Sequence, residues 1–224
     1  MSLEAHVEAK YRKWLEDPAI DEATKSELHQ LAGNEREIED RFFKDLEFGT
    51  GGLRGVIGAG SNRMNVYTVG KSTQGLAEYL LKEAAGQPVS VVIAYDSRRM
   101  SFEFAKEAAL VLAGNGIKSY VFESLRPTPE LSFAVRHLGA AAGIVITASH
   151  NPPEYNGYKV YGPDGGQIVP DVADRVIAHI QTITSFSDIR KLGEQEALAQ
   201  GLLQWIGEDV DKAYIEAVTS LSQH

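Results

Sequence analysis

Short apolar runs alternate with amphipathic stretches through the middle of the chain, and this alternation limits the possible folds more than any other feature. The runs at 88–95, 120–122 and 143–146 are rich in β-branched or aromatic residues and predict buried strands. The stretches at 102–114 and 130–138 repeat apolar residues at helical spacing. Parallel strands joined by helices in this way form right-handed crossovers. We therefore predict an α/β fold, a three-layer αβα sandwich with a mixed, mostly parallel sheet.

Polar residues follow two of these predicted strands at the point where each strand ends. The residues Asp-Ser-Arg-Arg occupy 96–99, directly after one strand, and a longer polar segment at 147–161 follows another. In an open α/β sheet the carboxyl ends of the parallel strands share one rim, and ligands bind there. The two segments are therefore expected to lie close together and to form a ligand site.

The segment at 147–161 reads TASHNPPEYNGYKVY, and neither core packing nor an ordinary surface turn explains its composition. Pro152 and Pro153 remove two backbone donors and disfavour helical geometry before them, so the chain is expected to stay open after the strand. The Asn-Gly pair at 156–157 predicts a tight turn, and 158–161 predicts a short returning strand.

The bend formed in this way would carry Ser149 and His150, with Lys159 returning towards them. A serine hydroxyl beside an imidazole and an ammonium supplies a nucleophile, a proton acceptor and a charge that holds an anion. The residues alone also allow a plainer interpretation, in which Ser149 caps its own turn and His150 is solvated.

A second distinctive segment is rich in glycine and contains a single arginine. It reads FGTGGLRGVIGAG over 48–60, which permits close backbone approach but gives little to bury. Arg54 stands where the dinucleotide-binding fingerprint needs its last glycine, so that motif is excluded. A Walker A motif ending at 70–73 is excluded too, because Asn65 occupies the place of a required glycine. Taken alone, the segment is equally consistent with a surface turn.

The motifs TASHNP and NGYK within 147–161 together resemble the phosphoserine loop of the α-D-phosphohexomutase superfamily, which includes phosphoglucomutases and phosphomannomutases. The resemblance implies that Ser149 carries the exchanged phosphoryl group and that Lys159 is a general acid/base. It extends to the glycine-rich segment, where it implies that Arg54 faces Ser149. The usual form has alanine where this chain has Gly52, a departure that we expect mainly to loosen the loop.

The resemblance also implies a reaction cycle. Phospho-Ser149 would give its phosphoryl group to a free hydroxyl of a hexose phosphate, and the resulting hexose bisphosphate would turn over and return its other phosphate. Positive groups must gather around the phosphate, and His150 would be one of them. Arg98 or Arg99 would assist, or would instead form a salt bridge at the rim. The expected substrate-binding residues are Thr147, Asn151, Asn156 and Arg98.

A Mg²⁺ ion is implied in the same way, bound by a phosphate oxygen on Ser149 and by three aspartates in an Asp-Gly-Asp type loop. No such loop occurs in these 224 residues. We therefore expect the chain to be the N-terminal, phosphoserine-bearing domain of a longer mutase, in which later domains supply the remaining metal ligands. Alone, it should have little or no mutase activity.

Composition excludes several classes of function. The formal net charge of −9 argues against nucleic acid or an anionic membrane as a partner. The chain has no cysteine, so it can form neither a disulfide framework nor a thiolate metal site. It shows no apolar signal region and no apolar run of membrane length, and a cytoplasmic enzyme is expected.

The chain divides into three expected regions. A helical lead-in occupies 1–46, the αβα domain occupies 47–184, and 185–224 is expected to be a linker and a helix leading to an absent second domain. The expected partners are hexose phosphate, hexose bisphosphate and those later domains. Three alternatives remain: a phosphopentomutase of the same superfamily, a non-catalytic phosphosugar-binding module, and a serine-dependent phosphohydrolase.

Overall fold

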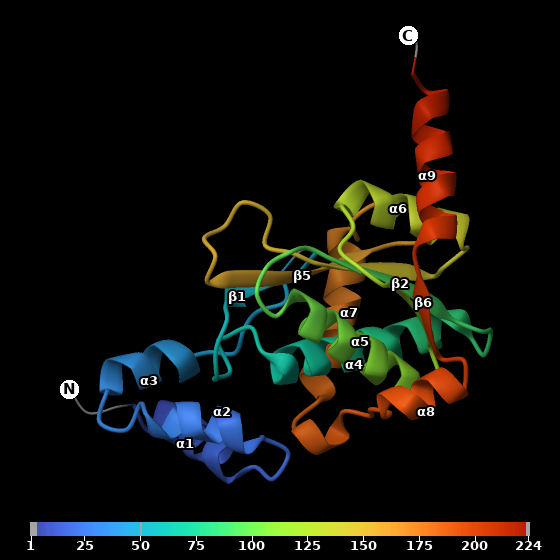
Figure 1. Cartoon of the computed structure of the whole chain (residues 1–224). Helices are drawn as coiled ribbons and strands as arrows, with labels where there is room; N and C mark the ends of the chain where they lie inside the picture. The colour runs from blue at the N-terminus through green and yellow to red at the C-terminus, as the bar shows by residue number, and fades with distance from the viewer. Residues whose placement is uncertain (1–3, 50, 223–224) are drawn as a thin grey trace.

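The computed structural model describes residues 4–49 and 51–222, which form a six-stranded sheet flanked by helices (Figure 1). Leu3, in the predicted lead-in, and Thr50, in the glycine-rich segment, lie outside the described residues. The strands are β1 Gly52–Val56, β2 Ser90–Tyr95, β3 Lys118–Phe122, β4 Ala142–Ile146, β5 Tyr155–Tyr161 and β6 Leu203–Ile206. The helices are α1 Ala5–Glu16, α2 Glu22–His29, α3 Glu35–Phe42, α4 Val66–Ala84, α5 Ser101–Gly114, α6 Thr128–His137, α7 Pro170–Thr182, α8 Glu194–Ala199 and α9 Glu208–Ser220, with a 3₁₀ turn η1 at Phe186–Asp188. None of these described helices is both long and apolar enough to cross a bilayer.

The sheet confirms the predicted mixed, mostly parallel arrangement. Its strands lie in the order β1-β5-β4-β2-β3-β6. β2 pairs in parallel with β3 and β4, and β6 pairs in parallel with β3. β5 runs antiparallel to β4, and β1 runs antiparallel to β5. The carboxyl ends of β2 and β4 therefore meet at one rim.

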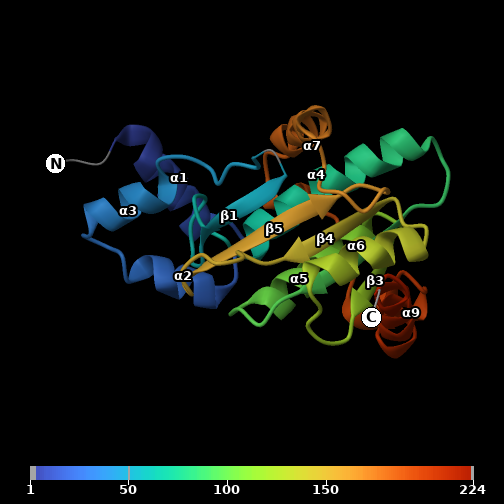
Figure 2. The same cartoon turned by 90° about the horizontal axis from the view of Figure 1, so that it is seen from above.

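Helices cover the two faces of the sheet unequally. Residues of α4 and α5 form one core with the sheet, and α7 packs on α4. On the other face α6 packs on β2 and β4, and α9 packs on α6. Figure 2 shows α6 beside β4, with β5 and β1 further out. On this side Tyr161, the last residue of β5, belongs to the apolar cluster of α6, whereas Arg54 of β1 is exposed and Lys159 of β5 is partly exposed.

The central strands are apolar because both of their faces are covered. Every residue of β4 is buried, and so is all of β2 except its first residue. The side chains of Ile93 and Ile144 are fully buried. Burying each such side chain contributes roughly 1.5–3 kcal/mol. The continuous apolar runs in the sequence therefore reflect strands enclosed between two helical layers.

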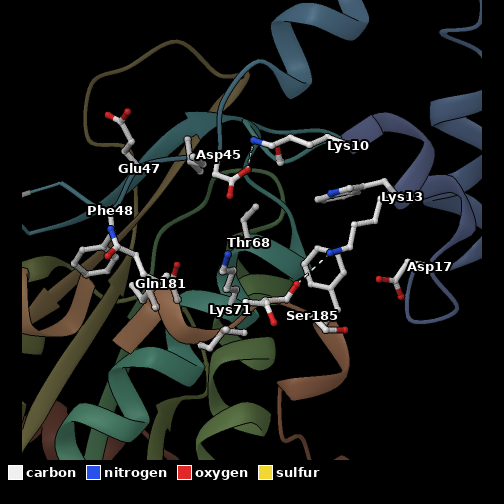
Figure 3. A pocket seen from close by; sticks show the side chains of 18 of the residues that line it. Lys10, Lys13, Asp17, Asp45, Glu47, Phe48, Thr68, Lys71, Gln181 and Ser185 are labelled. Atoms are coloured by element: carbon white, nitrogen blue, oxygen red, sulfur yellow. Dashed lines mark hydrogen bonds and ion pairs between the residues drawn. The ribbon is translucent and has the colours of Figure 1, made fainter. Parts of the chain in front are cut away.

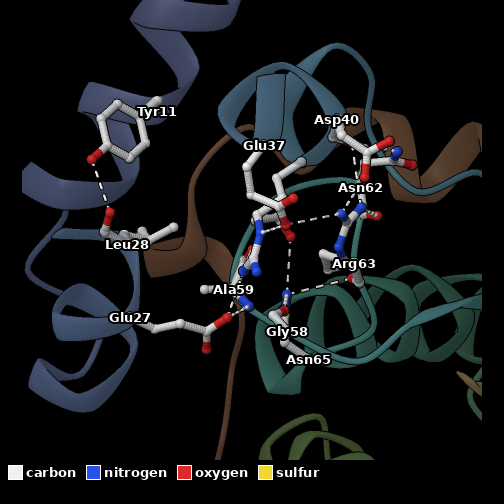
Figure 4. Close-up of polar contacts among 12 residues, drawn as sticks. Tyr11, Glu27, Leu28, Glu37, Asp40, Gly58, Ala59, Asn62, Arg63 and Asn65 are labelled. Atoms are coloured by element: carbon white, nitrogen blue, oxygen red, sulfur yellow. Dashed lines mark hydrogen bonds and ion pairs between the residues drawn. The ribbon is translucent and has the colours of Figure 1, made fainter. Parts of the chain in front are cut away.

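The lead-in packs as a small helical cluster of its own, built around Trp14, Leu28 and Phe42. Polar contacts fasten this cluster to the segment that follows β1 (Figure 4). The amide of Ala59 donates to Glu27 Oε1 at 3.1 Å, and the carbonyl of Ala59 accepts from Arg41 Nη1 at 3.0 Å. The lead-in is therefore attached to the chain just after the strand that carries Arg54.

Two predictions about the glycines are wrong. Asn156 and Gly157 form no turn but lie inside β5, opposite Gly55 and Arg54 of β1. A Cβ atom at 157 would lie 2.5 Å from the carbonyl oxygen of Thr147, so this glycine allows strands to approach closely. Gly52 does not loosen a loop, because a Cβ atom there would lie 1.8 Å from the carbonyl oxygen of Tyr158.

Residues 185–224 contain more than the expected linker and final helix. They include η1, α8 and the strand β6, which extends the sheet beyond β3. Only Leu203 and Ile206 of β6 are buried, while the two residues between them are more exposed. A strand this short, with two buried positions, carries too weak an apolar pattern to be recognised in the sequence.

Candidate active site at the bend after β4

Ser149 lies on an exposed bend directly after β4, in the left-handed region of backbone geometry with φ of 54°. Two other described non-glycine residues share this geometry, Ala85 and Met100, and both flank a helix. Ser149 flanks none, so its backbone is held by specific contacts instead. Its amide donates to Thr147 Oγ1 at 2.9 Å. Such a conformation is unfavourable for a residue with a side chain and is frequent at functional sites.

The ammonium of Lys159 meets the serine hydroxyl directly. Lys159 Nζ donates to Ser149 Oγ at 2.9 Å. Burial lowers the pKa of Lys159, the nearby charge of Arg54 lowers it further, and Asp96 partly opposes both effects. A lowered pKa lets an amine exchange a proton more readily near neutral pH. The returning strand thus brings the Lys159 amine into contact with the serine hydroxyl at the bend.

Arg54 lies on the same face of the sheet as Lys159. In the β1–β5 register Arg54 is opposite Gly157, two residues before Lys159, and alternate residues of a strand share a face. The side chain is exposed on the α6 side of the sheet, beyond the part that α6 covers. His150 is also exposed and makes no hydrogen bond with any described residue. Both side chains are therefore accessible to an anionic ligand at the bend.

Arg98, which we expected to bind substrate, is instead turned into the loop that carries Ser149. Its side chain is only 15% exposed, and its Nε lies 3.5 Å from Asp96 Oδ2. Its Nη atoms donate to four carbonyl oxygens, those of Ser149 at 2.8 Å, Asn151 at 2.6 Å, Pro152 at 2.9 Å and Tyr155 at 3.2 Å. Arg99 is exposed. The sequence pattern places Arg98 at the correct rim but contains no sign that its acceptors are main-chain carbonyls.

Asn156, another expected substrate contact, is fully buried. Its Nδ2 donates to the carbonyl of Arg99 at 2.9 Å and to Ser101 Oγ at 3.0 Å. Ser101 Oγ in turn donates to Asp96 Oδ1 at 2.7 Å. Asn156 therefore joins β5 to the loop after β2 and has no surface to offer a substrate.

The two remaining expected contacts differ in their hydrogen bonding. Thr147 is buried, and its hydroxyl already accepts from the Ser149 amide. Asn151 Oδ1 is buried and has no hydrogen-bond partner among the described residues. An unsatisfied buried acceptor costs about 1–3 kcal/mol. Asn151 is therefore the better placed of the two to gain a bond when a ligand arrives.

Comparison with known proteins shows which family the chain belongs to. Residues 45–187 match the family model for phosphoglucomutase/phosphomannomutase, alpha/beta/alpha domain I. The chain belongs to the phosphoglucomutase/phosphomannomutase family. The matched residues include β1 to β5, α4 to α7 and the loops between them, and so contain every residue of the candidate site described in this subsection.

Relatives within this phosphoglucomutase/phosphomannomutase family include two staphylococcal phosphoglucomutases. The one from Staphylococcus saprophyticus is 39% identical over 208 residues, which are 93% of this chain and 37% of that protein. The one from Staphylococcus aureus strain bovine RF122 is 45% identical over 170 residues, 76% of this chain and 30% of that protein. The chain thus spans about a third of the length of these curated relatives.

Solved structures of the family share the fold. A Thermus thermophilus protein assigned to the phosphomannomutases matches 79% of this chain and 36% of its own chain, at 31% identity and a TM-score of 0.66. The open form of the Paramecium phosphoglucomutase pp63/parafusin matches 80% of this chain and 35% of its own, at 18% identity and a TM-score of 0.64. The second likeness concerns the fold alone.

The family uses Mg²⁺, but the described residues do not form a site for it. No group of three or more His, Cys, Asp or Glu side chains in the described chain could hold a metal ion. Asp96, the carboxylate near Lys159, is occupied by Arg98 and Ser101. Mg²⁺ in proteins takes oxygen ligands from carboxylates, phosphates and water, and the described chain has no free group of carboxylates that would complete such a site.

A cavity of about 390 Å³ lies away from Ser149, where the lead-in meets α4 and α7 (Figure 3). Two of its lysines are engaged, since Lys10 Nζ donates to Asp45 Oδ1 at 2.9 Å and Lys13 Nζ donates to the carbonyl of Thr184 at 3.2 Å. No residue from the carboxyl ends of β2 and β4 lines it. Ser149, Lys159 and Arg54 are therefore not part of this cavity.

Proposed function

We propose that this chain is the phosphoserine-bearing domain of a phosphohexomutase, an isomerase that moves a phosphoryl group between C1 and C6 of a hexose phosphate. The observation that carries the proposal is the 2.9 Å contact between Lys159 Nζ and the hydroxyl of Ser149 at an exposed, left-handed bend. Membership of the family supports it, since relatives at about 40% identity are named phosphoglucomutase.

In the proposed chemistry, Ser149 Oγ attacks the phosphorus of one phosphate of a hexose bisphosphate. The new bond joins phosphorus to Oγ, and the bond from phosphorus to the sugar oxygen breaks. Lys159, as neutral amine, takes the proton from the hydroxyl and delivers it to the departing sugar oxygen. The reverse step comes first in the cycle: phospho-Ser149 gives its phosphoryl group to the free hydroxyl of a hexose monophosphate, and the bisphosphate formed turns over. Attack of Ser149 on its other phosphate then releases the isomeric monophosphate and restores phospho-Ser149.

Positive groups around the bend stabilise the phosphoryl group during transfer. Phosphoryl transfer depends mainly on positioning and electrostatic stabilisation. Arg54 and the exposed imidazole of His150 supply these on the open face, and their accessibility supports the assignment. Asn151, which is half-buried in the same bend, is assigned a contact with a sugar hydroxyl. Mg²⁺, the sugar-selecting contacts and mutase turnover are assigned to later domains of a longer chain.

The test is the transfer of one phosphate to Ser149. Incubating the chain with glucose 1,6-bisphosphate is expected to raise its intact mass by about 80 Da, located at Ser149 by peptide mapping. Ser149→Ala should gain no mass, whereas Ser97→Ala, which changes another exposed serine of the same rim, should gain it. No mass gain in the wild type would favour a phosphosugar-binding module, and steady release of inorganic phosphate would favour a phosphohydrolase.

Comparing glucose 1,6-bisphosphate with ribose 1,5-bisphosphate as donor addresses the phosphopentomutase alternative. Because the sugar-selecting contacts are assigned to later domains, the comparison is made in a longer chain that includes them, and there the hexose donor is expected to phosphorylate Ser149 faster. Glucose 1-phosphate should not be converted to glucose 6-phosphate at an appreciable rate by this chain alone, because the assigned metal and sugar contacts lie elsewhere. Rapid conversion would contradict the assignment of those contacts to later domains.

A further inference from the structure

We infer that Arg98 is a positioning residue, whose guanidinium holds the bend that sets the Ser149 hydroxyl against Lys159. The inference rests on the proposed function, since the group being positioned is the proposed phosphoryl carrier. Arg98 itself touches neither Oγ of Ser149 nor the Lys159 amine; its contacts are with main-chain oxygens and one carboxylate.

The contacts of Arg98 span the whole bend. The four carbonyls come from residues between the end of β4 and the first residue of β5, and each Nη atom serves two of them. Nε faces the carboxylate of Asp96 at 3.5 Å. A guanidinium has five N–H donors in one rigid plane. Five acceptors surround them here, so Arg98 cannot donate to a substrate without releasing the loop.

The loop needs an outside donor because its own sequence removes donors. Pro152 and Pro153 have no amide hydrogen, so the bend cannot satisfy its carbonyls through a regular backbone ladder. Ser149 is moreover held at an unfavourable φ of 54°. The Nη2 bond of 2.8 Å to the carbonyl of Ser149 acts on the peptide unit of the serine itself. Arg98 thus supplies N–H donors to the carbonyls of the bend in place of the amide donors that the prolines lack.

Arg98 is in turn fixed to the sheet. Its amide donates to Asp96 Oδ1 at 2.9 Å, and Asp96 follows directly on the buried strand β2. The amide of Asp96 donates to the carbonyl of Ile146, the last residue of β4. Ser149 is therefore held in place relative to the rigid centre of the sheet, although the serine itself lies on an exposed loop.

The experiment replaces Arg98 by lysine, which keeps the charge but cannot reach four carbonyls with one compact ammonium. Two quantities are measured: the single-turnover rate constant for phosphorylation of Ser149 by glucose 1,6-bisphosphate, and hydrogen exchange of amides at 148–157. Arg98→Lys is expected to lower the rate constant by roughly 10- to 100-fold, because small displacements of a nucleophile have effects of that order. The half-saturating bisphosphate concentration should change by less than about threefold.

Exchange at 148–157 should become faster in Arg98→Lys, while exchange in β2 and β4 stays unchanged. The matched control is Arg136→Lys, since Arg136 Nε donates to a single carbonyl, that of Ser132 at 3.3 Å, on α6. The control should leave the rate constant and the exchange at 148–157 unaltered. A milder variant, Asp96→Asn, should speed exchange at 148–157 on a smaller scale, because it weakens the Nε contact while an amide oxygen can still accept from Arg98 N and Ser101 Oγ. Only exchange is compared in this variant, since Asp96 also acts on the pKa of Lys159.

Three results would overturn the inference. One is an unchanged rate constant with unchanged exchange in Arg98→Lys. Another is a higher half-saturating concentration alone, which would make Arg98 a substrate contact. The third is equally fast exchange throughout the protein, which would make it a general stability residue. If the wild type accepts no phosphate, the proposed function fails, and the exchange comparison still decides whether Arg98 holds the bend.

Discussion

The positions and pKa values of single residues around Ser149 depend on the strands that carry these residues. The Lys159 amine reaches the serine hydroxyl because β5 returns beside β4, and the Arg54 charge acts on that amine because β1 pairs with β5. The low pKa of Lys159 is caused first by burial and then by Arg54. The neighbours of Lys159 on one sheet face thereby lower the pKa of the proposed proton-transfer group.

Replacing Arg54 by glutamine is expected to raise the pKa of Lys159, because a positive charge that disfavours the ammonium is removed. Competitive acetylation of Lys159 across a pH series, read by mass spectrometry, measures this pKa independently of activity. Arg175→Gln serves as control, since Arg175 lies on α7 and pairs with Glu83. An unchanged or lower pKa in Arg54→Gln would contradict the electrostatic contact between the two strands.

Gly52 is predicted to be essential for folding. Its φ is +147°, and a Cβ atom would overlap the carbonyl oxygen of Tyr158 at 1.8 Å. Gly52→Ala should therefore lower the free energy of unfolding by about 2–4 kcal/mol. Gly193→Ala, at a glycine with ordinary φ and open space around it, should change it by less than about 0.5 kcal/mol. Urea denaturation midpoints test both, and equal midpoints would contradict the predicted clash.

At the scale of elements, α6 and α9 are joined by a buried ionic cluster. Arg126, just before α6, donates from Nε and Nη2 to the two carboxylate oxygens of Asp211 on α9, at 2.7 and 2.6 Å. Glu130 of α6 is 5% exposed, and its Oε1 has no hydrogen-bond partner among the described residues. Burial, and next the neighbouring Asp211, raise the pKa of Glu130 to about 7.

This cluster should make stability depend on pH. Because the pKa of Glu130 is higher in the folded chain than its ordinary value of 4.5, the folded state binds more protons between pH 4.5 and about 7. Stability relative to Glu130→Gln should therefore fall as pH rises through that window, by at most about 1.4 kcal/mol per pH unit. Glu216→Gln, at an exposed position of α9, should track the wild type. If the curves of unfolding free energy against pH are parallel for the wild type and Glu130→Gln, the predicted pH dependence is refuted.

The sequence predicts elements well where the apolar pattern is strong. β2, β4, α4 and α5 follow from long apolar runs or stripes. The pattern does not reveal β1, because Gly51, Gly52 and Gly55 hide the strand, and the close approach of Gly52 to β5 exists only in three dimensions. For the same reason Asn156-Gly157 resembles a turn in the sequence. Motif resemblance is enough to find Ser149, Lys159 and Arg54, but the role of Arg98 depends on carbonyls, which every residue has.

On the scale of the whole molecule, the lead-in contacts the segment that follows β1, besides its contacts with Tyr67 of α4 and Phe186 of η1. Arg41 is 15% exposed at its side chain, pairs with Glu27 and Glu37, and donates to the carbonyl of Ala59. Ala59 follows β1 by three residues. The helical cluster at the N-terminal end is therefore expected to stabilise the strand that carries Arg54.

Arg41→Met should lower the free energy of unfolding by about 1–3 kcal/mol, because two partly buried carboxylates lose their partner and solvent screens part of the loss. Hydrogen exchange in 52–60 should become faster in this variant. Arg12→Met, which removes only a surface pair with Glu8, is expected to change stability by less than about 1 kcal/mol. Equal effects of the two substitutions would mean that the lead-in is not fastened through Arg41.

The left-handed backbone at residue 149 restricts which hydroxyl-bearing amino acid can occupy this position. Threonine bears the same hydroxyl and accepts phosphate equally well, but a branched Cβ is disfavoured at φ of 54°. The fold thus selects serine over threonine through its main chain, before any property of the oxygen is considered.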